Sequence, residues 1–274
     1  MKRVATLVLN RNLPEVTDRL CEHLEQYDGG VTDVFVVEAG SDPDRLSSHT
    51  TWHATWPDAT ARGLRYSRGM NYGLSRLWQD GRFFQYEAFF LLTNDTELED
   101  KPTLAPLMSI LDRHARVGLL SPCSPRWGER FLLREEATRY FWFIHNNAYL
   151  MRRQFVETII DKDANDHMSF LFDGTNFRGY GSESEVIAKA YVNDWAAAIT
   201  AEVWAGENES HLLTRADLIK TESYEANLKL YVEEGLTWMR RKYGFNSRWS
   251  MQRYVKCFYD SFFEFNPELE RYRI

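Results

Sequence analysis

Short apolar runs of this chain end abruptly in polar turns at three places, after residues 4–9, 34–37 and 89–92. The amide, hydroxyl and acidic side chains in these turns are Asn10, Asn12, Glu38, Ser41, Asn94 and Asp95. Runs of this length, bounded by turn residues, are typical of buried strands in a parallel sheet. Ligands of open α/β sheets bind just beyond the carboxyl ends of the strands. We therefore expect these side chains to line one binding site.

Asp95, which follows the third run, is a candidate metal ligand. An acidic residue at this point can hold a divalent cation against a phosphate, because Mg²⁺ usually takes one or two carboxylates together with substrate phosphate oxygens. The alternative is structural, since aspartate commonly caps a following helix. The residue type by itself leaves both roles open.

The segments around these runs have helical periodicity. Pro14 can open a helix at its first turn, and apolar residues then recur every four positions. Residues 70–78 show the same kind of spacing. Strands that alternate with helices predict a three-layer α/β sheet.

Two C-terminal helices are predicted, from residues 227–243 and from the apolar stripe over 251–262. They are expected to pack on the rest of the chain or on a second subunit. Basic aromatic helices are also compatible with a membrane surface.

Composition narrows the class of protein. The chain has 274 residues, of which 44% are hydrophobic and 27% are charged, as in ordinary globular domains. Its formal net charge of −7 argues against a nucleic-acid partner, which needs basic surface. Three widely separated cysteines, Cys21, Cys123 and Cys257, show no metal-ligand spacing and are typical of reduced thiols in a cytosolic protein.

Four segments in order resemble the family-2 glycosyltransferases of the GT-A fold, particularly their rhamnosyltransferase-like and cell-surface-polysaccharide branch. Residues 10–13 look like the polar turn after that family's first strand. Residues 36–42 look like its V-V-D-N-x-S nucleotide-binding turn, with Glu38 in place of aspartate. Residues 66–74 are similar to its G-x-N-x-G helix opening, and residues 91–97 match the L-L-N-x-D-T form of its Asp-x-Asp metal motif.

The resemblance continues downstream. Residues 146–153 look like the strand and R-R turn that precede the family's acceptor helix. Residues 172–177 and 180–186 resemble its F-D-x-x-F and Y-x-E-D-x-D-L segments. In all, the match covers roughly residues 4–210.

The resemblance implies a GT-A fold, with a mostly parallel central sheet flanked by helices and a C-terminal helical extension. Residues 1–215 would form the catalytic domain, with a nucleotide-sugar-binding half to residue 115 and an acceptor half from residue 116, and residues 216–274 would form the extension. The implied activity is inverting transfer of a hexosyl or deoxyhexosyl group from a nucleotide diphosphate sugar to a hydroxyl of a saccharide or lipid-linked saccharide, in polysaccharide biosynthesis. We expect a cytoplasmic protein, and contact with the inner face of a membrane and homo-oligomerisation are both compatible with the sequence.

The resemblance also assigns residue roles. Glu183 falls at the position of the catalytic base, and Asp95 would hold Mg²⁺ or Mn²⁺ on the donor diphosphate. Thr93 stands where the metal motif usually has its first Asp or Asn, and Ala205 stands where the family often has a metal-binding histidine, which makes His211 the substitute candidate. The implied nucleotide-sugar-binding residues are Asn10, Asn12, Glu38, Ser41, Arg68, Asn71, Asn94 and Asp95.

Each assignment has a simpler alternative. Glu183 could be a solvated acidic residue at a helix start, Arg68 a surface charge on an amphipathic helix, and His211 a structural histidine. Thr93 and Ala205 also favour a catalytically silent GT-A-like module that binds saccharide or scaffolds an assembly. A sugar-1-phosphate nucleotidyltransferase is disfavoured, because residues 10–14 lack the glycines of its phosphate loop.

Overall fold

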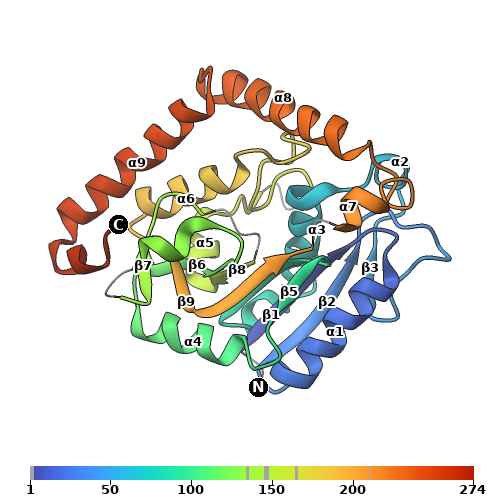
Figure 1. Cartoon of the computed structure of the whole chain (residues 1–274), viewed down its shortest axis with the longest axis horizontal. Coiled ribbons are helices and arrows are strands. Elements are labelled where there is room, and N and C mark those ends of the chain that lie inside the picture. The colour runs from blue at the N-terminus through green and yellow to red at the C-terminus, as the bar shows by residue number, and fades with distance from the viewer. Residues whose placement is uncertain (1–2, 134–135, 145–147, 164–165, 209) are drawn as a thin grey trace.

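The computed structural model of the chain describes residues 3–133, 136–144, 148–163, 166–208 and 210–274. Helices flank one central sheet (Figure 1). The strands of the described residues are β1 (Val4–Asn10), β2 (Thr32–Glu38), β3 (Thr50–His53), β4 (Ala88–Thr93), β5 (Thr96–Leu98), β6 (Val117–Cys123), β7 (Thr138–Tyr140), β8 (Tyr149–Arg152) and β9 (Ala196–Glu207). The helices are α1 (Pro14–Asp28), α2 (Pro57–Arg62), α3 (Arg65–Gln79), α4 (Leu104–Arg113), α5 (Arg153–Ile159), α6 (Ser182–Val192), α7 (Ser210–Thr214), α8 (Tyr224–Tyr243) and α9 (Arg248–Phe265).

The three apolar runs form β1, β2 and β4, which lie side by side and parallel. Their carboxyl ends therefore meet at one edge of the sheet, as the sequence predicted. The sheet order is β3-β2-β1-β4-β8-β6-β9-β5, with β7 paired to β9. The pairings make β5, β7 and β8 antiparallel to the other described strands, so the predicted mostly parallel sheet is confirmed with antiparallel insertions.

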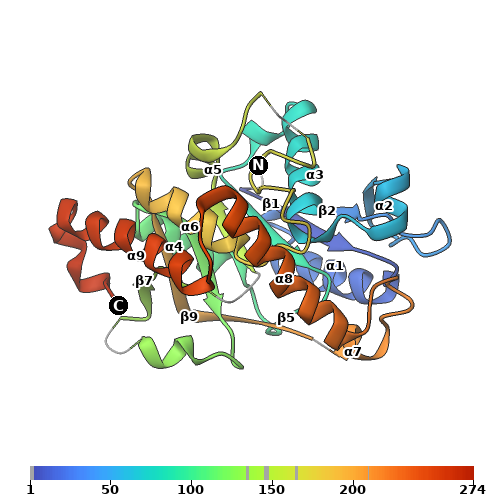
Figure 2. The ribbon, with the colours of Figure 1, turned by 90° about the horizontal axis from the view of Figure 1, so that it is seen from above.

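Helices cover both faces of the sheet. Every residue of β1 and β6 is buried, which a strand achieves when elements pack on both of its faces. Helices α1 and α3 both contact β1 and β2, and Figure 2 shows them on opposite sides of this part of the sheet. The predicted helical spacing after Pro14 and over residues 70–78 corresponds to these two helices.

The two C-terminal helices form an arch along one side of the molecule (Figure 1). Helix α9 packs on α6, and α8 closely approaches Tyr180 at Gly235, where a Cβ would lie 2.4 Å from the Tyr180 Cβ. The predicted helical extension is thereby confirmed, whereas a domain boundary at residue 215 stays a prediction. No helix of the described residues is long and apolar enough to span a membrane.

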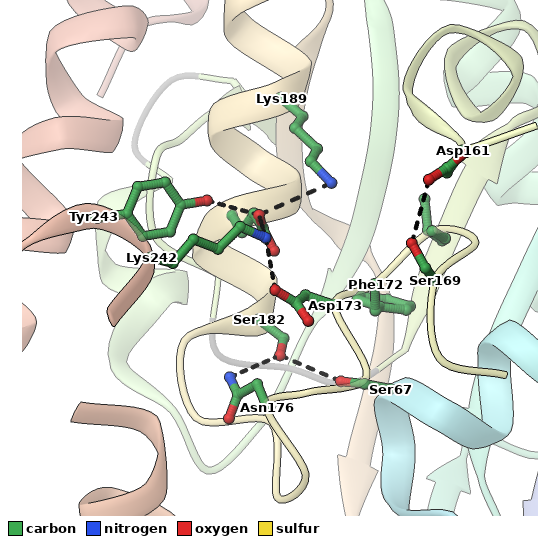
Figure 3. Close-up of polar contacts among 12 residues, drawn as sticks. Ser67, Asp161, Ser169, Phe172, Asp173, Asn176, Ser182, Lys189, Lys242 and Tyr243 are labelled. Atoms are coloured by element: carbon green, nitrogen blue, oxygen red, sulfur yellow. Dashed lines mark hydrogen bonds and ion pairs between the residues drawn. The ribbon is translucent and has the colours of Figure 1, made fainter. Parts of the chain in front are cut away.

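A partly buried ion cluster fixes the end of α8. The Lys242 ammonium lies 2.7 Å from both the Asp173 and the Glu185 carboxylates, and Tyr243 donates a 2.6 Å hydrogen bond to Glu185. Figure 3 shows Lys242 and Tyr243 converging on this point from one turn of α8. Because the Glu185 side chain is only 3% exposed, its charge depends on these partners.

Lys242→Met should lower the free energy of unfolding by about 1–3 kcal/mol, because it leaves the buried Glu185 carboxylate without its nearest cation. The matched control is Lys229→Met in the same helix, where the pair with Glu233 is 75% and 57% exposed. That pair should contribute no more than about 0.5 kcal/mol. Urea unfolding of both variants gives the comparison, and equal losses would contradict an anchoring role for Lys242.

Candidate functional site

A cavity of about 220 Å³, here called the edge cavity, lies at the carboxyl ends of β1 and β4. Its lining combines amide, acidic, imidazole and guanidinium groups, and the polar residues are Asn10, Arg11, Arg65, Thr93, Asn94, Asp95, His211 and Thr221. The structure therefore brings together four of the residues singled out from sequence, Asn10, Asn94, Asp95 and His211. The strand-end pattern identified the first three, because the parallel strands β1 and β4 are neighbours.

Hydrogen bonds between side chains hold the strand ends in register at this cavity. The Asn94 amide donates to the Asn10 Oδ1 across 2.8 Å. The Asn10 amide in turn donates to both oxygens of Glu38, at 2.9 and 3.1 Å. The ends of β4, β1 and β2 are thus connected in one chain of side-chain hydrogen bonds.

Glu38 lies behind the cavity and shapes its wall. The side chain is fully buried, and besides Asn10 its carboxylate accepts hydrogen bonds from Ser41 Oγ at 2.5 Å, Ser47 N at 2.8 Å and Thr50 Oγ1 at 3.0 Å. A buried carboxylate needs such donors. With its oxygens used this way, Glu38 orders the turn after β2, and its contact with a nucleotide stays a prediction.

Asn12 and Ser41 are also used within the protein. Asn12 has a left-handed backbone, with φ of 58°, and its amide donates to Asp42 and to the Leu218 carbonyl at 2.8 Å. Ser41 accepts a hydrogen bond from the Asn12 backbone N–H. Both residues are buried and absent from the cavity lining, so their structural role is to join two turns.

Arg68 and Asn71 lie away from the edge cavity. Arg68 donates to the Gly174 carbonyl at 2.7 Å and pairs with Asp58 at 3.2 Å. Asn71 makes four hydrogen bonds with the backbone of residues 167–172. The face of α3 that carries them packs on this segment. Arg68 is only 8% exposed, so its alternative as a surface charge is wrong, while its predicted contact with a diphosphate stays a prediction.

Two arginines that the sequence analysis did not assign line the edge cavity instead. Burial and the neighbouring Arg65 guanidinium lower the pKa of Arg11 to about 10. Burial and Arg178 lower the pKa of Arg65. Each keeps a buried Nε that has no hydrogen-bond partner among the described residues. Two partly desolvated like charges with spare donors form a site that favours an anion.

Local backbone features place these arginines. Arg11 lies in the polar turn after β1. A Cβ added to Gly63 would lie only 2.0 Å from the Arg11 Nη1. Gly63 also has a φ of 75°, so two independent constraints favour glycine there. Arg65 begins α3 with a φ of 56°. Arg11 could have been noticed because it lies between Asn10 and Asn12, whereas the orientation of Arg65 depends on its unusual backbone.

Asp95 and His211 both line the edge cavity. Asp95 comes from the turn after β4, and His211 comes from α7. The strand β5 follows Asp95, and the next helix begins only after Thr103, so the helix-cap alternative is wrong. Burial and Arg215 lower the pKa of His211, which favours the neutral imidazole that metals bind. A carboxylate and an imidazole fit a divalent cation that takes further ligands from phosphates, and no set of three such residues exists in the described part of the chain.

A second cavity, here called the aromatic cavity, has a volume of about 640 Å³ and a lining that is separate from that of the edge cavity. Its lining is rich in aromatic side chains around two carboxylates, and includes Trp127, Phe143, Tyr180, Glu183, Glu207, Tyr224, Tyr231 and Trp249. Lining residues of the two cavities are neighbours at the β5–β9 ladder, since Glu207 pairs with Thr96, the residue after Asp95, and the Asn208 N–H donates to the Asp95 carbonyl at 2.8 Å. Helices α8 and α9 supply much of the outer wall.

Glu183 lies in the first turn of α6, as the sequence predicted, where it is partly buried and lines the aromatic cavity. Gly181 precedes the helix with a φ of 81° and turns the chain into it. Burial raises the pKa of Glu183 to about 7, and the backbone N–H groups of the helix start and Ser184 oppose this shift only in part. Desolvation therefore outweighs the helix dipole, which alone would favour ionisation.

Two tyrosines, the buried Tyr149 and the partly buried Tyr66, lie near both carboxylates. The Tyr66 and Tyr149 hydroxyls have no hydrogen-bond partner among the described residues. Burial, with Glu183 and Glu207 as further causes, raises the pKa of both phenols well above the usual value. Because Arg65 precedes Tyr66 on α3, adjacent residues of this helix reach the edge cavity and the surroundings of Glu183.

No protein-family model matches the chain, and no curated protein matches it by sequence. Solved structures do match its fold. The mannosyltransferase PcManGT from Pyrobaculum calidifontis, in complex with GDP-Man and Mn²⁺, is 14% identical, with a TM-score of 0.50 over 93% of this chain and 85% of that one. TarS from S. aureus, residues 1–349 with UDP, is 13% identical, with a TM-score of 0.51 over 88% of this chain and 73% of that one.

A third match is GalNAc-T7 with UDP, GalNAc and Mn²⁺, which is 8% identical, with a TM-score of 0.56 over 96% of this chain and 56% of that one. At these identities the likeness establishes the fold alone. The chain therefore has the GT-A fold of nucleotide-sugar glycosyltransferases, as the sequence resemblance implied, while the rhamnosyltransferase-like branch stays a prediction.

The raised pKa of Glu183 makes stability depend on pH. Between about pH 4.5 and 7 the folded protein holds a proton that the unfolded chain has released, so stability falls as the pH rises through this window. Glu183→Gln removes the titrating group while keeping the shape. The melting temperatures of variant and wild type should be similar near pH 5, and the variant should be the more stable near pH 8. A constant difference between the two proteins across this range would contradict a buried, protonated Glu183.

Proposed function

We propose that this protein is an inverting glycosyltransferase that moves a sugar from a nucleotide diphosphate sugar to a hydroxyl of a saccharide or lipid-linked saccharide. The observation that carries the proposal is a GT-A fold with two cavities whose acidic lining residues Asp95 and Glu207 lie close together at the β5–β9 ladder. One has two desolvated arginines beside Asp95 and His211, and the other has Glu183 with a pKa near neutrality.

The edge cavity suits the nucleotide diphosphate. Negative charge develops on this leaving group as its bond to the sugar breaks, and fixed positive donors in a site of low dielectric stabilise such charge. Arg11 and Arg65 would contact the diphosphate oxygens. Burial lowers the pKa of both groups, with Arg65 as a further cause for Arg11 and Arg178 as a further cause for Arg65, and an anion would offset this loss of solvation and this repulsion. Asn10 and Asn94 line the cavity from the adjacent strand ends, where their amide N–H groups hold the wall in place by donating within the protein.

Asp95 and His211 would hold a divalent cation on the diphosphate. Bound there, Mg²⁺ or Mn²⁺ would act as a Lewis acid toward the phosphate oxygens. The presence of Mn²⁺ in the structures of PcManGT and GalNAc-T7 supports this part of the proposal. Thr93, in place of an acidic residue, leaves the cation with few protein ligands, so the diphosphate itself would complete its coordination.

Glu183 would act as the general base for the acceptor. The acceptor hydroxyl transfers its proton to the Glu183 carboxylate while its oxygen bonds to the anomeric carbon, and the bond from that carbon to the diphosphate breaks on the opposite side. A base works best when its pKa lies near the working pH, and the pKa of Glu183 is about 7. Inversion requires the base on the face of the sugar opposite the leaving group, and the separate cavities of Glu183 and of Arg11 and Arg65 are compatible with this requirement.

A catalytically silent saccharide-binding module is the second candidate. It is favoured by Thr93 in the metal motif and by the lack of a three-residue metal set among the described residues. Such a module would bind saccharide in the aromatic cavity without turnover of any nucleotide sugar. The cytoplasmic location, membrane contact and homo-oligomerisation inferred from sequence stay predictions.

Nucleotide binding tests the edge cavity. Arg11→Gln and Arg65→Gln should each weaken binding of UDP or GDP, measured calorimetrically with Mn²⁺, by about 10- to 100-fold, which is the usual effect of losing a charge-assisted hydrogen bond. The matched control is Arg62→Gln, since Arg62 is 54% exposed, pairs with Asp58 and lies outside the cavity lining. An equal loss in all three variants would indicate a general charge effect and contradict the site.

The rate of sugar transfer tests the role of Glu183 as the base. Transfer of labelled sugar to a panel of free saccharides should rise about tenfold per pH unit below pH 7 and level off above it, because only the ionised carboxylate accepts a proton. Glu183→Gln should lower the rate by about 10²- to 10⁴-fold while leaving nucleotide affinity unchanged. Full activity of this variant would exclude Glu183 as the base, and binding without turnover in the wild type would favour the silent module.

A further inference from the structure

The mouth of the aromatic cavity carries large apolar side chains that are exposed to solvent. Trp127 is 39% exposed, Leu228 49% and Trp249 65%, and all three also line the cavity. They come from separate segments, namely the residue before a short 3-10 helix over Gly128–Leu132, helix α8 and helix α9. Single exposed apolar residues are ordinary. Here three of the nine large ones exposed in the described part of the chain share one cavity mouth.

The polarity of the cavity changes from its inner to its outer end. Glu183 and Glu207 are partly buried carboxyl groups of the lining, and exposed indole and isobutyl groups form the rim, where the Arg248 guanidinium also lies 4.6 Å from the centroid of the Trp249 ring. A volume of about 640 Å³ is in the range of sites that enclose ligands larger than one sugar ring. A ligand that matched this cavity would carry hydroxyl groups at one end and an apolar group at the other.

The rim is held in a fixed position relative to Glu183. On α9, Gln252 donates a 3.0 Å hydrogen bond to Ser184, the residue next to Glu183. At the end of α8, Lys242 binds Glu185 on the same turn of α6. Both helices that carry rim residues are therefore attached within two residues of the candidate base, so that a molecule in contact with the rim is also positioned with respect to Glu183.

We propose that the acceptor is an amphiphile, a saccharide whose ring hydroxyl reaches Glu183 and whose alkyl or isoprenoid chain leaves the cavity across Leu228 and Trp249. This inference rests on the proposed function, because it uses Glu183 to decide which end of the ligand enters first. The chain covers apolar surface that is otherwise in contact with water, and this burial supplies affinity in proportion to chain length.

The test is the affinity of alkyl β-glucosides, from methyl to octyl, measured calorimetrically below their micelle-forming concentrations. Each methylene that contacts the rim should raise the affinity by about fourfold, the increment for burying one CH₂. In Leu228→Ser and Trp249→Ala the increment should fall below about twofold. Phe265→Ala is the matched control, because Phe265 lies on the same helix α9, is 83% exposed and is absent from the cavity lining.

Three results would overturn the inference. Affinity that does not depend on chain length would make the ligand a plain saccharide. A dependence that is equal in wild type, Trp249→Ala and Phe265→Ala would place the chain elsewhere on the protein. Equal binding to phosphatidylcholine vesicles that contain no glycoside would make the rim a membrane contact.

The same experiment separates this inference from the proposed function. Nucleotide affinity is measured independently at the edge cavity. Nucleotide binding without a chain-length effect would refute the amphiphilic acceptor alone, while a rim-dependent chain-length effect without nucleotide binding would refute the transferase and retain an amphiphile site.

Discussion

The site depends on the hydrogen bonds that the buried carboxylate of Glu38 accepts. Its hydrogen bonds connect the Asn10 amide at the end of β1 with the turn after β2 in one network. Asn10 then fixes Asn94, the residue before Asp95. A buried charge of this kind is stable only with its donors in place, so the positions of three strand ends are coupled. The edge cavity exists because of that coupling.

Electrostatics divide the site into two halves that do different work. Arg11 and Arg65 gather positive charge in the edge cavity, where burial lowers the pKa of both groups. Glu183 lies across the β5–β9 ladder, where burial instead raises the pKa of a carboxyl group. Desolvation is the same physical cause in each case. It makes one half receptive to an anion and the other able to take up a proton near neutral pH.

Much of the fold could be predicted from local patterns, and less of the site. Apolar runs and helical spacing gave β1, β2, β4, α1 and α3, because burial on a regular element leaves a period in the sequence. Asn10, Asn94 and Asp95 followed from strand ends. Arg68 and Asn71 lie outside the edge cavity because the loop of residues 167–174, distant in sequence, covers their face of α3. Arg65 was missed because a left-handed backbone directs it.

The most direct measurement is anomalous diffraction from crystals soaked with Mn²⁺ and either UDP or GDP. The central claim is that the edge cavity binds a nucleotide diphosphate with a cation. A manganese peak bonded to Asp95, with the diphosphate in contact with Arg11 and Arg65, would agree with it. A nucleotide bound in the aromatic cavity, or a manganese ion distant from Asp95 and His211, would contradict it.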